Sequence, residues 1–209
     1  MPLFGALFLA KRATLKKNAY IYTRHGYKTL IMEIKLEKKE IKDLHSWVLK
    51  HPMTWENAPA TKKHLSKEEI ILDKKIDMFF GRCGELAVQK AFGGSFIKEG
   101  NGEYGGDWLS PKNKIWEIKT QNILNRIYPT LSIDLTWKQL KRYKANNIKG
   151  IILCTAEFSL DTFIVNPIIN IVAYTFIRHF EYSPAKKKYE GQHSIDFSIY
   201  ENQWNFYKL

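Results

Sequence analysis

The chain has 209 residues, of which 44% are hydrophobic, and this excludes an intrinsically disordered protein. The formal net charge of +12 and the isoelectric point near 9.5 favour a polyanionic partner, either nucleic acid or an acidic membrane surface. A solvated basic surface without a partner is the alternative. Cys83 and Cys154 form no CxxC or Cys/His motif, which excludes a zinc finger and predicts reduced core cysteines.

The N-terminal segment is basic. The apolar run at residues 3–10 is shorter than the ~20 residues that a membrane span needs. Lys11 and Arg12 follow this run, whereas the basic residues of a signal peptide precede its apolar run. The first 32 residues contain six Lys and Arg and no Asp or Glu. This composition favours a nucleic-acid-binding arm or a structural strand and leaves organelle targeting open. We expect an intracellular protein of the cytoplasm or nucleoid, or of the host cell if it is viral, with no membrane association.

The first 72 residues predict a small, separate unit. Alternating and β-branched residues indicate strands at 20–22 and 29–36, and apolar spacing indicates a helix at 38–49. Residues 51–67 contain Pro52 and Pro59 among many polar residues, which is typical of a linker. The sequence therefore predicts a basic N-terminal extension or small subdomain at 1–72 and a core domain at 73–209.

The core segment predicts alternating helices and strands. A helix at 73–92 is closed by Gly93 and Gly94, and a short strand is expected at 95–98. A glycine-rich turn at 99–106 leads to a hairpin whose strands are 107–110 and 114–120. A helix at 136–147 with Thr136 as N-cap precedes a buried strand at 150–155, and further strands are expected at 168–178 and 194–200. This order predicts an α/β fold.

Three residues of the predicted hairpin are the main candidates for an active site, namely Asp107, Glu117 and Lys119. The hairpin brings Asp107 to the strand that carries Glu117, and the period of two puts Glu117 and Lys119 on one face with Ile118 pointing into the core. Two carboxylates suit Mg²⁺, which prefers oxygen ligands, lowers the pKa of bound water and polarises a phosphate. Lys119 can orient the water, and Gln121 on the same face can contact the phosphate.

The chain contains GGDW followed, after eight residues, by EIKT. This pattern resembles the motif of PD-(D/E)XK nucleases, and the resemblance covers about residues 73–155. Gly106 stands where that family often has proline. The resemblance implies a restriction-endonuclease-like core, in which a central mixed β-sheet is flanked by helices. It also implies that Asp107 and Glu117 bind Mg²⁺, for which Mn²⁺ can substitute, with the Ile118 carbonyl as a further ligand.

A second Glu-x-Lys triplet occurs at Glu33 and Lys35 on an expected strand. No Asp or Glu precedes residue 33, so this triplet lacks a metal-binding partner upstream in the sequence. We interpret Glu33 and Lys35 as the solvated face of a structural strand.

Glu85 is a further candidate ligand, because a glutamate on the helix before the hairpin often completes the metal site of this family. The helical wheel places Glu85 opposite the main apolar stripe, which is typical of a surface residue. However, its own flank is unusually apolar for a solvent-facing side and consists of Met78, Gly81, Val88 and Phe92. We predict that Glu85 belongs to the catalytic and metal-binding residues.

The predicted helix after the Glu-x-Lys strand contains Gln139 and Tyr143, which resemble the QxxxY element of RecB-type nucleases. At this spacing the two side chains share one helix face and could contact the DNA backbone; a chance match is the alternative. Lys138, Lys141 and Arg142 make the helix basic, which suits phosphate binding.

These features together predict a Mg²⁺-dependent DNA endonuclease, such as a junction resolvase, a restriction or homing endonuclease, or a phage-type nuclease. A RecB-type exonuclease and a non-catalytic nucleic-acid-binding protein are the alternatives. A homodimer would allow both strands of a duplex to be cut, since one such site cuts one strand.

Overall fold

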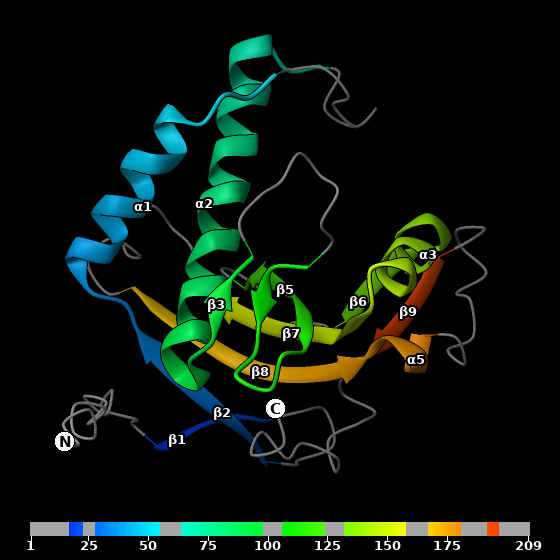
Figure 1. Cartoon of the computed structure of the whole chain (residues 1–209). Helices are drawn as coiled ribbons and strands as arrows, with labels where there is room; N and C mark the ends of the chain where they lie inside the picture. The colour runs from blue at the N-terminus through cyan, green and yellow to red at the C-terminus, as the bar shows by residue number, and fades with distance from the viewer. Residues whose placement is uncertain are drawn as a thin grey trace, which may run out of the picture.

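The largest element of the computed structural model is a mixed β-sheet (Figure 1). The structure describes residues 17–22, 28–54, 64–97, 106–123, 132–157, 167–180 and 192–196. The described part of this sheet has seven strands in the order β1-β2-β8-β7-β5-β4-β3. Their bounds are Lys17–Tyr22 (β1), Lys28–Lys35 (β2), Ser95–Phe96 (β3), Trp108–Leu109 (β4), Ile115–Asn122 (β5), Ile148–Ala156 (β7) and Ile168–Phe176 (β8).

Strands β5 and β7 are parallel, and the other neighbours in this sheet pair antiparallel. A parallel pair needs a crossover connection, and here it contains α3 (Trp137–Ala145). A separate antiparallel pair is formed by β6 (Ser132–Thr136) and β9 (Gln192–Asp196). The sequence did not predict β6, whose partner lies far along the chain.

Helix α2 packs on one face of the large sheet with α1 beside it, and α3 lies toward the other face (Figure 1). Helix α1 (Lys38–Lys50) begins with a capping box in which Glu40 accepts a hydrogen bond from the Glu37 N–H. Helix α2 (Lys67–Phe92) ends where Gly93 adopts a φ of 75°, as the sequence predicted. A short helix, α5 (Ile177–Phe180), follows β8 directly, so the strand expected at 168–178 ends at Phe176.

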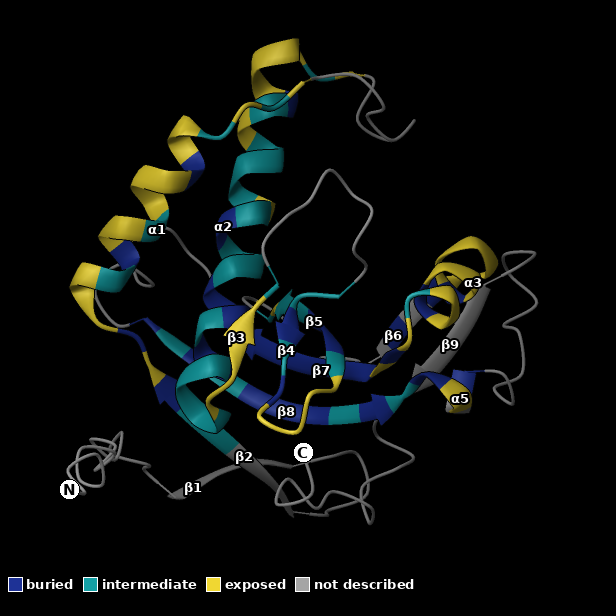
Figure 2. Ribbon diagram, viewed as in Figure 1, coloured by how far each residue is buried: buried dark blue, intermediate teal, exposed yellow. Residues whose placement is uncertain are grey.

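The sheet separates two hydrophobic cores, and β7 contributes to both (Figure 2). Ile152 and Cys154 face α1 and α2, while Ile151 and Leu153 face α3 and α5. This alternation explains why β7 is a continuous apolar run rather than an alternating one, because a strand covered on both faces needs apolar residues at every position.

Helix α2 approaches β5 closely at Gly84. A Cβ atom built on Gly84 would lie 2.0 Å from Thr120 Oγ1 and 3.2 Å from Thr120 Cβ. At Gly81, one turn earlier, a Cβ atom would meet nothing within 4 Å. The contact between helix and sheet therefore requires glycine at position 84 and not at position 81.

The expected start of α2 at residue 73 was wrong. Ser66 caps the helix by accepting a hydrogen bond from the Glu69 N–H, while Glu69 accepts one from the Ser66 N–H, so the helix begins at Lys67. The position between residues 72 and 73, the expected domain boundary, lies inside this helix. Strand β2 pairs with β8, and Ile34, Leu36 and Ile41 belong to the same core as α2.

The remaining predicted elements match the structure where it describes them. The β4–β5 hairpin, β7 and the Thr136 cap of α3 are confirmed, since Thr136 accepts a hydrogen bond from the Gln139 N–H. The apolar run at 3–10, most of the expected linker, the turn at 99–105 and residues 197–200 lie outside the described residues. Among the helices that the structure describes, none is long and apolar enough to span a membrane.

Candidate active site

Strand β5 provides the centre of the candidate site. Glu117 pairs in register with Ile151 of β7, and both side chains lie on the α3 face of the sheet. Ile118 points to the opposite face, where it is 5% exposed within the core beneath α2. Lys119 shares the face of Glu117 by the strand period. The predicted arrangement of this triplet is therefore confirmed.

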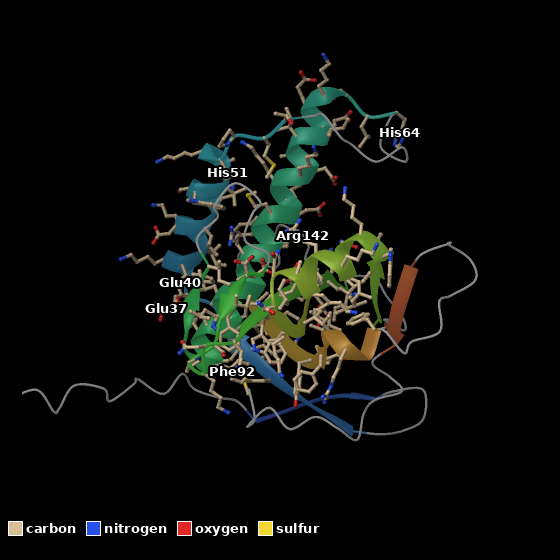
Figure 3. The ribbon with its side chains drawn as sticks, turned by 45° about the vertical axis from the view of Figure 1, so that its right-hand side comes forward. Glu37, Glu40, His51, His64, Phe92 and Arg142 are labelled. Carbon is tan, nitrogen blue, oxygen red and sulfur yellow. The ribbon has the colours of Figure 1, made fainter. Side chains whose placement is uncertain are left out.

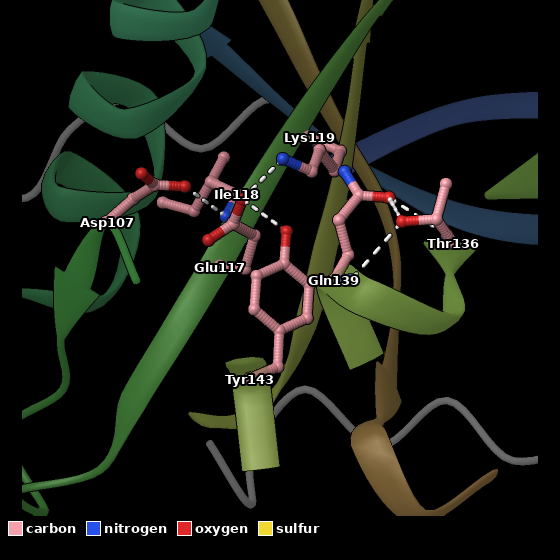
Figure 4. Close-up of polar contacts among 7 residues, drawn as sticks. All are labelled: Asp107, Glu117, Ile118, Lys119, Thr136, Gln139 and Tyr143. Atoms are coloured by element: carbon pink, nitrogen blue, oxygen red, sulfur yellow. Dashed lines mark hydrogen bonds and ion pairs between the residues drawn. The ribbon is translucent and has the colours of Figure 1, made fainter. Parts of the chain in front are cut away.

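Asp107 is fixed to β5 by two hydrogen bonds. Its backbone N–H donates to the Trp116 carbonyl at 2.8 Å, and its carboxylate Oδ2 accepts from the Ile118 N–H at 2.7 Å (Figure 4). In an extended strand the N–H and C=O of one residue point to the same side. The Ile118 carbonyl is therefore on the side of Asp107, as its predicted role as a metal ligand requires.

Glu117 is buried and only 7% exposed. Its Oε1 forms an ion pair with the Lys119 ammonium group and accepts a 2.8 Å hydrogen bond from the Tyr143 hydroxyl (Figure 4). Tyr143 is 3% exposed and comes from α3. The crossover helix is thus connected directly to the carboxylate on β5.

The charges of these residues influence one another. Burial, and then the nearby Glu117 carboxylate, raise the pKa of Asp107 to about 6, although the Ile118 N–H, Lys119 and Arg82 act in the opposite direction. Burial is the largest single influence on Lys119 and lowers its pKa, but the combined effect of Glu117, Tyr143 and Asp107 is larger and raises the pKa above its usual value. Lys119 is therefore cationic at neutral pH, beside two carboxylates that repel each other.

This donor set fits a divalent cation bound by oxygen ligands. A cation between Asp107 and Glu117 would relieve the mutual repulsion that raises the pKa of Asp107. Mg²⁺ typically takes one or two carboxylates and keeps several waters, so two carboxylates and one carbonyl suffice. Across the described part of the chain, no three His, Cys, Asp or Glu side chains form a metal-binding group, so Glu85 is not brought together with Asp107 and Glu117 in that way.

Glu85 lies on α2 and is 6% exposed, so it is not the surface residue that the helical wheel alone would give. Its carboxylate forms an ion pair with Arg82 one turn earlier. Arg82 weakly opposes the rise in the pKa of Asp107, and its guanidinium carbon lies 5.1 Å from the centre of the Trp47 ring. Arg82 was not among the residues predicted for the site, although its spacing from Glu85 is typical of helical ion pairs.

Gln139 and Tyr143 occupy different environments. Gln139 is exposed, and its Oε1 accepts a 2.9 Å hydrogen bond from the Thr136 N–H as part of the α3 cap (Figure 4). Tyr143 is buried against Glu117, so the two do not form one exposed DNA-binding face. Lys138, Lys141 and Arg142 are exposed on α3, and Lys141 Nζ lies 5.3 Å from the centre of the Trp137 ring.

Two further predicted positions lie on the same sheet. Gln121 is half-buried on the face of Lys119 and pairs with Thr155 of β7. Glu33 is half-buried on β2, and β8 and β7 lie between that strand and β5. The structure therefore brings Asp107, Glu117 and Lys119 together and leaves the Glu33 triplet apart from them.

Comparisons of the chain with protein-family models, with curated proteins and with solved structures find no match. The resemblance to PD-(D/E)XK nucleases therefore rests on the residues of the motif and on their geometry in this structure.

Proposed function

We propose that the protein is a metal-dependent nuclease that hydrolyses DNA phosphodiester bonds with Asp107, Glu117 and Lys119. The observation that carries this proposal is the hydrogen bond from the Ile118 N–H to the Asp107 carboxylate. It holds one carboxylate against the strand that bears the other carboxylate and the lysine. A restriction-endonuclease-like core is part of the proposal and agrees with the α/β class and the mixed sheet.

Each residue of the candidate site has a separate proposed role in hydrolysis. Asp107, Glu117 and the Ile118 carbonyl would hold Mg²⁺ or Mn²⁺, which supplies Lewis-acid activation of the phosphate and of water. Lys119 orients the attacking water and offsets the negative charge that grows on the phosphate. Water adds to phosphorus and releases a proton to solvent, the bond to the leaving oxygen breaks, and that oxygen takes up a proton from solvent. Tyr143 keeps the Glu117 carboxylate in place during these steps.

Substrate binding is assigned to α3. Its exposed Lys138, Lys141 and Arg142 lie on the helix that also reaches Glu117, so phosphates bound there would be adjacent to the cleavage site. Arg82 is a further cation beside Asp107. A homodimer would be needed for one enzyme to cut both strands at once.

Plasmid, linear duplex, single-stranded DNA and RNA incubated with Mg²⁺, and with a chelator in parallel, test the proposal. Nicking of closed circular DNA with Mg²⁺ alone supports an endonuclease. Digestion of linear DNA from its ends, with circles left intact, would instead indicate a RecB-type exonuclease. DNA binding without cleavage under Mg²⁺ or Mn²⁺ would indicate a non-catalytic binder.

A further inference from the structure

A groove with a volume of about 550 Å³ runs between α1 and α2, and it is independent of the candidate active site. The two helices lie side by side (Figure 3), where Glu37 and His51 mark the ends of α1. At one end of the groove the Lys75 ammonium group donates a 2.7 Å hydrogen bond to the Leu49 carbonyl, which fixes α2 to the C-terminal end of α1.

The floor of the groove is apolar, and its upper walls remain uncovered. Ile41, Val48 and Phe79 on the floor are 5%, 2% and 6% exposed. Leu49 and Leu72, one on each helix, also line the groove and are 54% and 57% exposed. An occupant that filled only the floor would leave both leucines in water, so the groove suits an occupant broad enough to cover its walls.

Among the residues that the structure describes, the charged side chains lining the groove are cationic. Lys38, Lys42 and Lys75 line it together with His45, and no described Asp or Glu does. On α1 the lining positions recur every three or four residues over roughly 16 Å, since a helix rises about 1.5 Å per residue. Two helix faces with this spacing form ridges and a groove that match the ridges of a third helix.

We propose that this groove binds an amphipathic α-helix of a partner protein, whose apolar face covers Leu49 and Leu72 and whose acidic flanks meet Lys38 and Lys42. A nucleic acid is disfavoured because phosphate gains nothing from an aliphatic floor. A second copy is disfavoured because the chain carries a net charge of +12, so self-association would bring like charges together.

The probe for this proposal is a synthetic helical peptide of about 18 residues, long enough to follow the groove at about 1.5 Å per residue. It carries leucines at helical spacing on one face and glutamates on both flanks, and a matched peptide has every glutamate replaced by lysine. Fluorescence anisotropy with the full chain should show binding of the glutamate peptide and at least tenfold weaker binding of the lysine peptide.

Variants identify the groove as the site. Leu72→Glu should weaken the glutamate peptide at least tenfold, because the new carboxylate lies in the apolar contact. The matched control is Trp137→Glu, which adds the same charge at another exposed apolar residue and should leave binding unchanged. The double variant Lys38→Glu/Lys42→Glu should reverse the preference toward the lysine peptide.

Four outcomes would overturn the proposal. One is that neither peptide binds, and another is that Leu72→Glu has no effect on binding. Displacement of an apolar dye by dodecanoate but not by peptide would show that the groove takes a small amphiphile. Self-association in sedimentation experiments that Leu72→Glu abolishes would show that the occupant is a second copy.

Discussion

The Tyr143 hydroxyl donates a 2.8 Å hydrogen bond to Glu117 Oε1, joining the crossover helix to a carboxylate 26 positions earlier in the chain. The QxxxY pattern had suggested that Tyr143 contacts DNA. Its burial at 3% exposure instead gives it a positioning role toward Glu117.

For Tyr143→Phe we expect kcat for DNA cleavage to fall by roughly tenfold or more, since a hydrogen bond to a charged group contributes about 1.5–3 kcal/mol. The affinity for DNA should not change, because the hydroxyl faces Glu117. Tyr174→Phe is the control, as that ring packs against Trp116 and Phe176 away from the site. Weaker DNA binding with normal kcat would restore the DNA-contact interpretation.

Glu85→Gln tests whether this buried carboxylate supports the metal site. We expect about 10–100-fold weaker Mn²⁺ binding by calorimetry, the effect typical of a residue that orients metal ligands, with partial recovery of cleavage at high Mg²⁺. Glu40→Gln is the matched control, because it breaks the 2.8 Å ion pair with Lys90 elsewhere on the helices.

A different result at position 85 would assign Glu85 to Arg82 instead. If Glu85→Gln and Arg82→Gln lost activity equally at every Mg²⁺ concentration, with unchanged Mn²⁺ affinity, the role of Glu85 would be to hold the guanidinium beside Asp107.

Gly84→Ala and Gly81→Ala form a matched pair on α2 for stability. Both changes should gain about 0.5–1 kcal/mol of helix propensity. At Gly84 the methyl group would overlap Thr120, and overpacking costs about 1–3 kcal/mol, so we expect net destabilisation. Gly81→Ala should raise the urea midpoint and Gly84→Ala should lower it. Equal midpoints would mean that α2 does not pack on β5 at Thr120.

The basic surface of α3 should determine the salt dependence of DNA binding. Lys138→Gln/Arg142→Gln should reduce the slope of log K against log salt by about two, since each phosphate contact contributes about 0.9 on B-DNA. Lys149→Gln on β7 removes an exposed lysine beside Phe176 and serves as the control. An unchanged slope in the double variant would place the DNA elsewhere.

Local chemistry made part of this structure predictable. The β4–β5 hairpin, the end of α2 at Gly93 and the Thr136 cap depend on neighbouring residues, and all were predicted. The alternation of Glu117, Ile118 and Lys119 follows from the strand period alone. The start of α2 was also encoded locally, in the capping box of Ser66 and Glu69, but the polar composition of that segment favoured a linker.

Long-range pairings were not predictable in the same way. Strand β2 pairs with β8, and Glu33 faces Asn170 across 137 positions of sequence, which no local pattern reveals. Likewise, the spacing of Gln139 and Tyr143 predicts that the two side chains share one helix face. It does not predict which other element of the fold packs against that face. Tertiary packing places Tyr143 against Glu117, whereas Gln139 is held by the local capping box with Thr136.

The most direct test of the proposed function is nicking of closed circular plasmid DNA by the full chain with Mg²⁺, compared among wild type, Glu117→Gln and Glu33→Gln. Both changes remove one carboxylate from a Glu-x-Lys triplet of the same sheet. We predict that wild type and Glu33→Gln nick the plasmid only with metal, and that Glu117→Gln loses at least roughly a hundredfold in rate. Full activity of a folded Glu117→Gln protein would contradict the assignment of the active site.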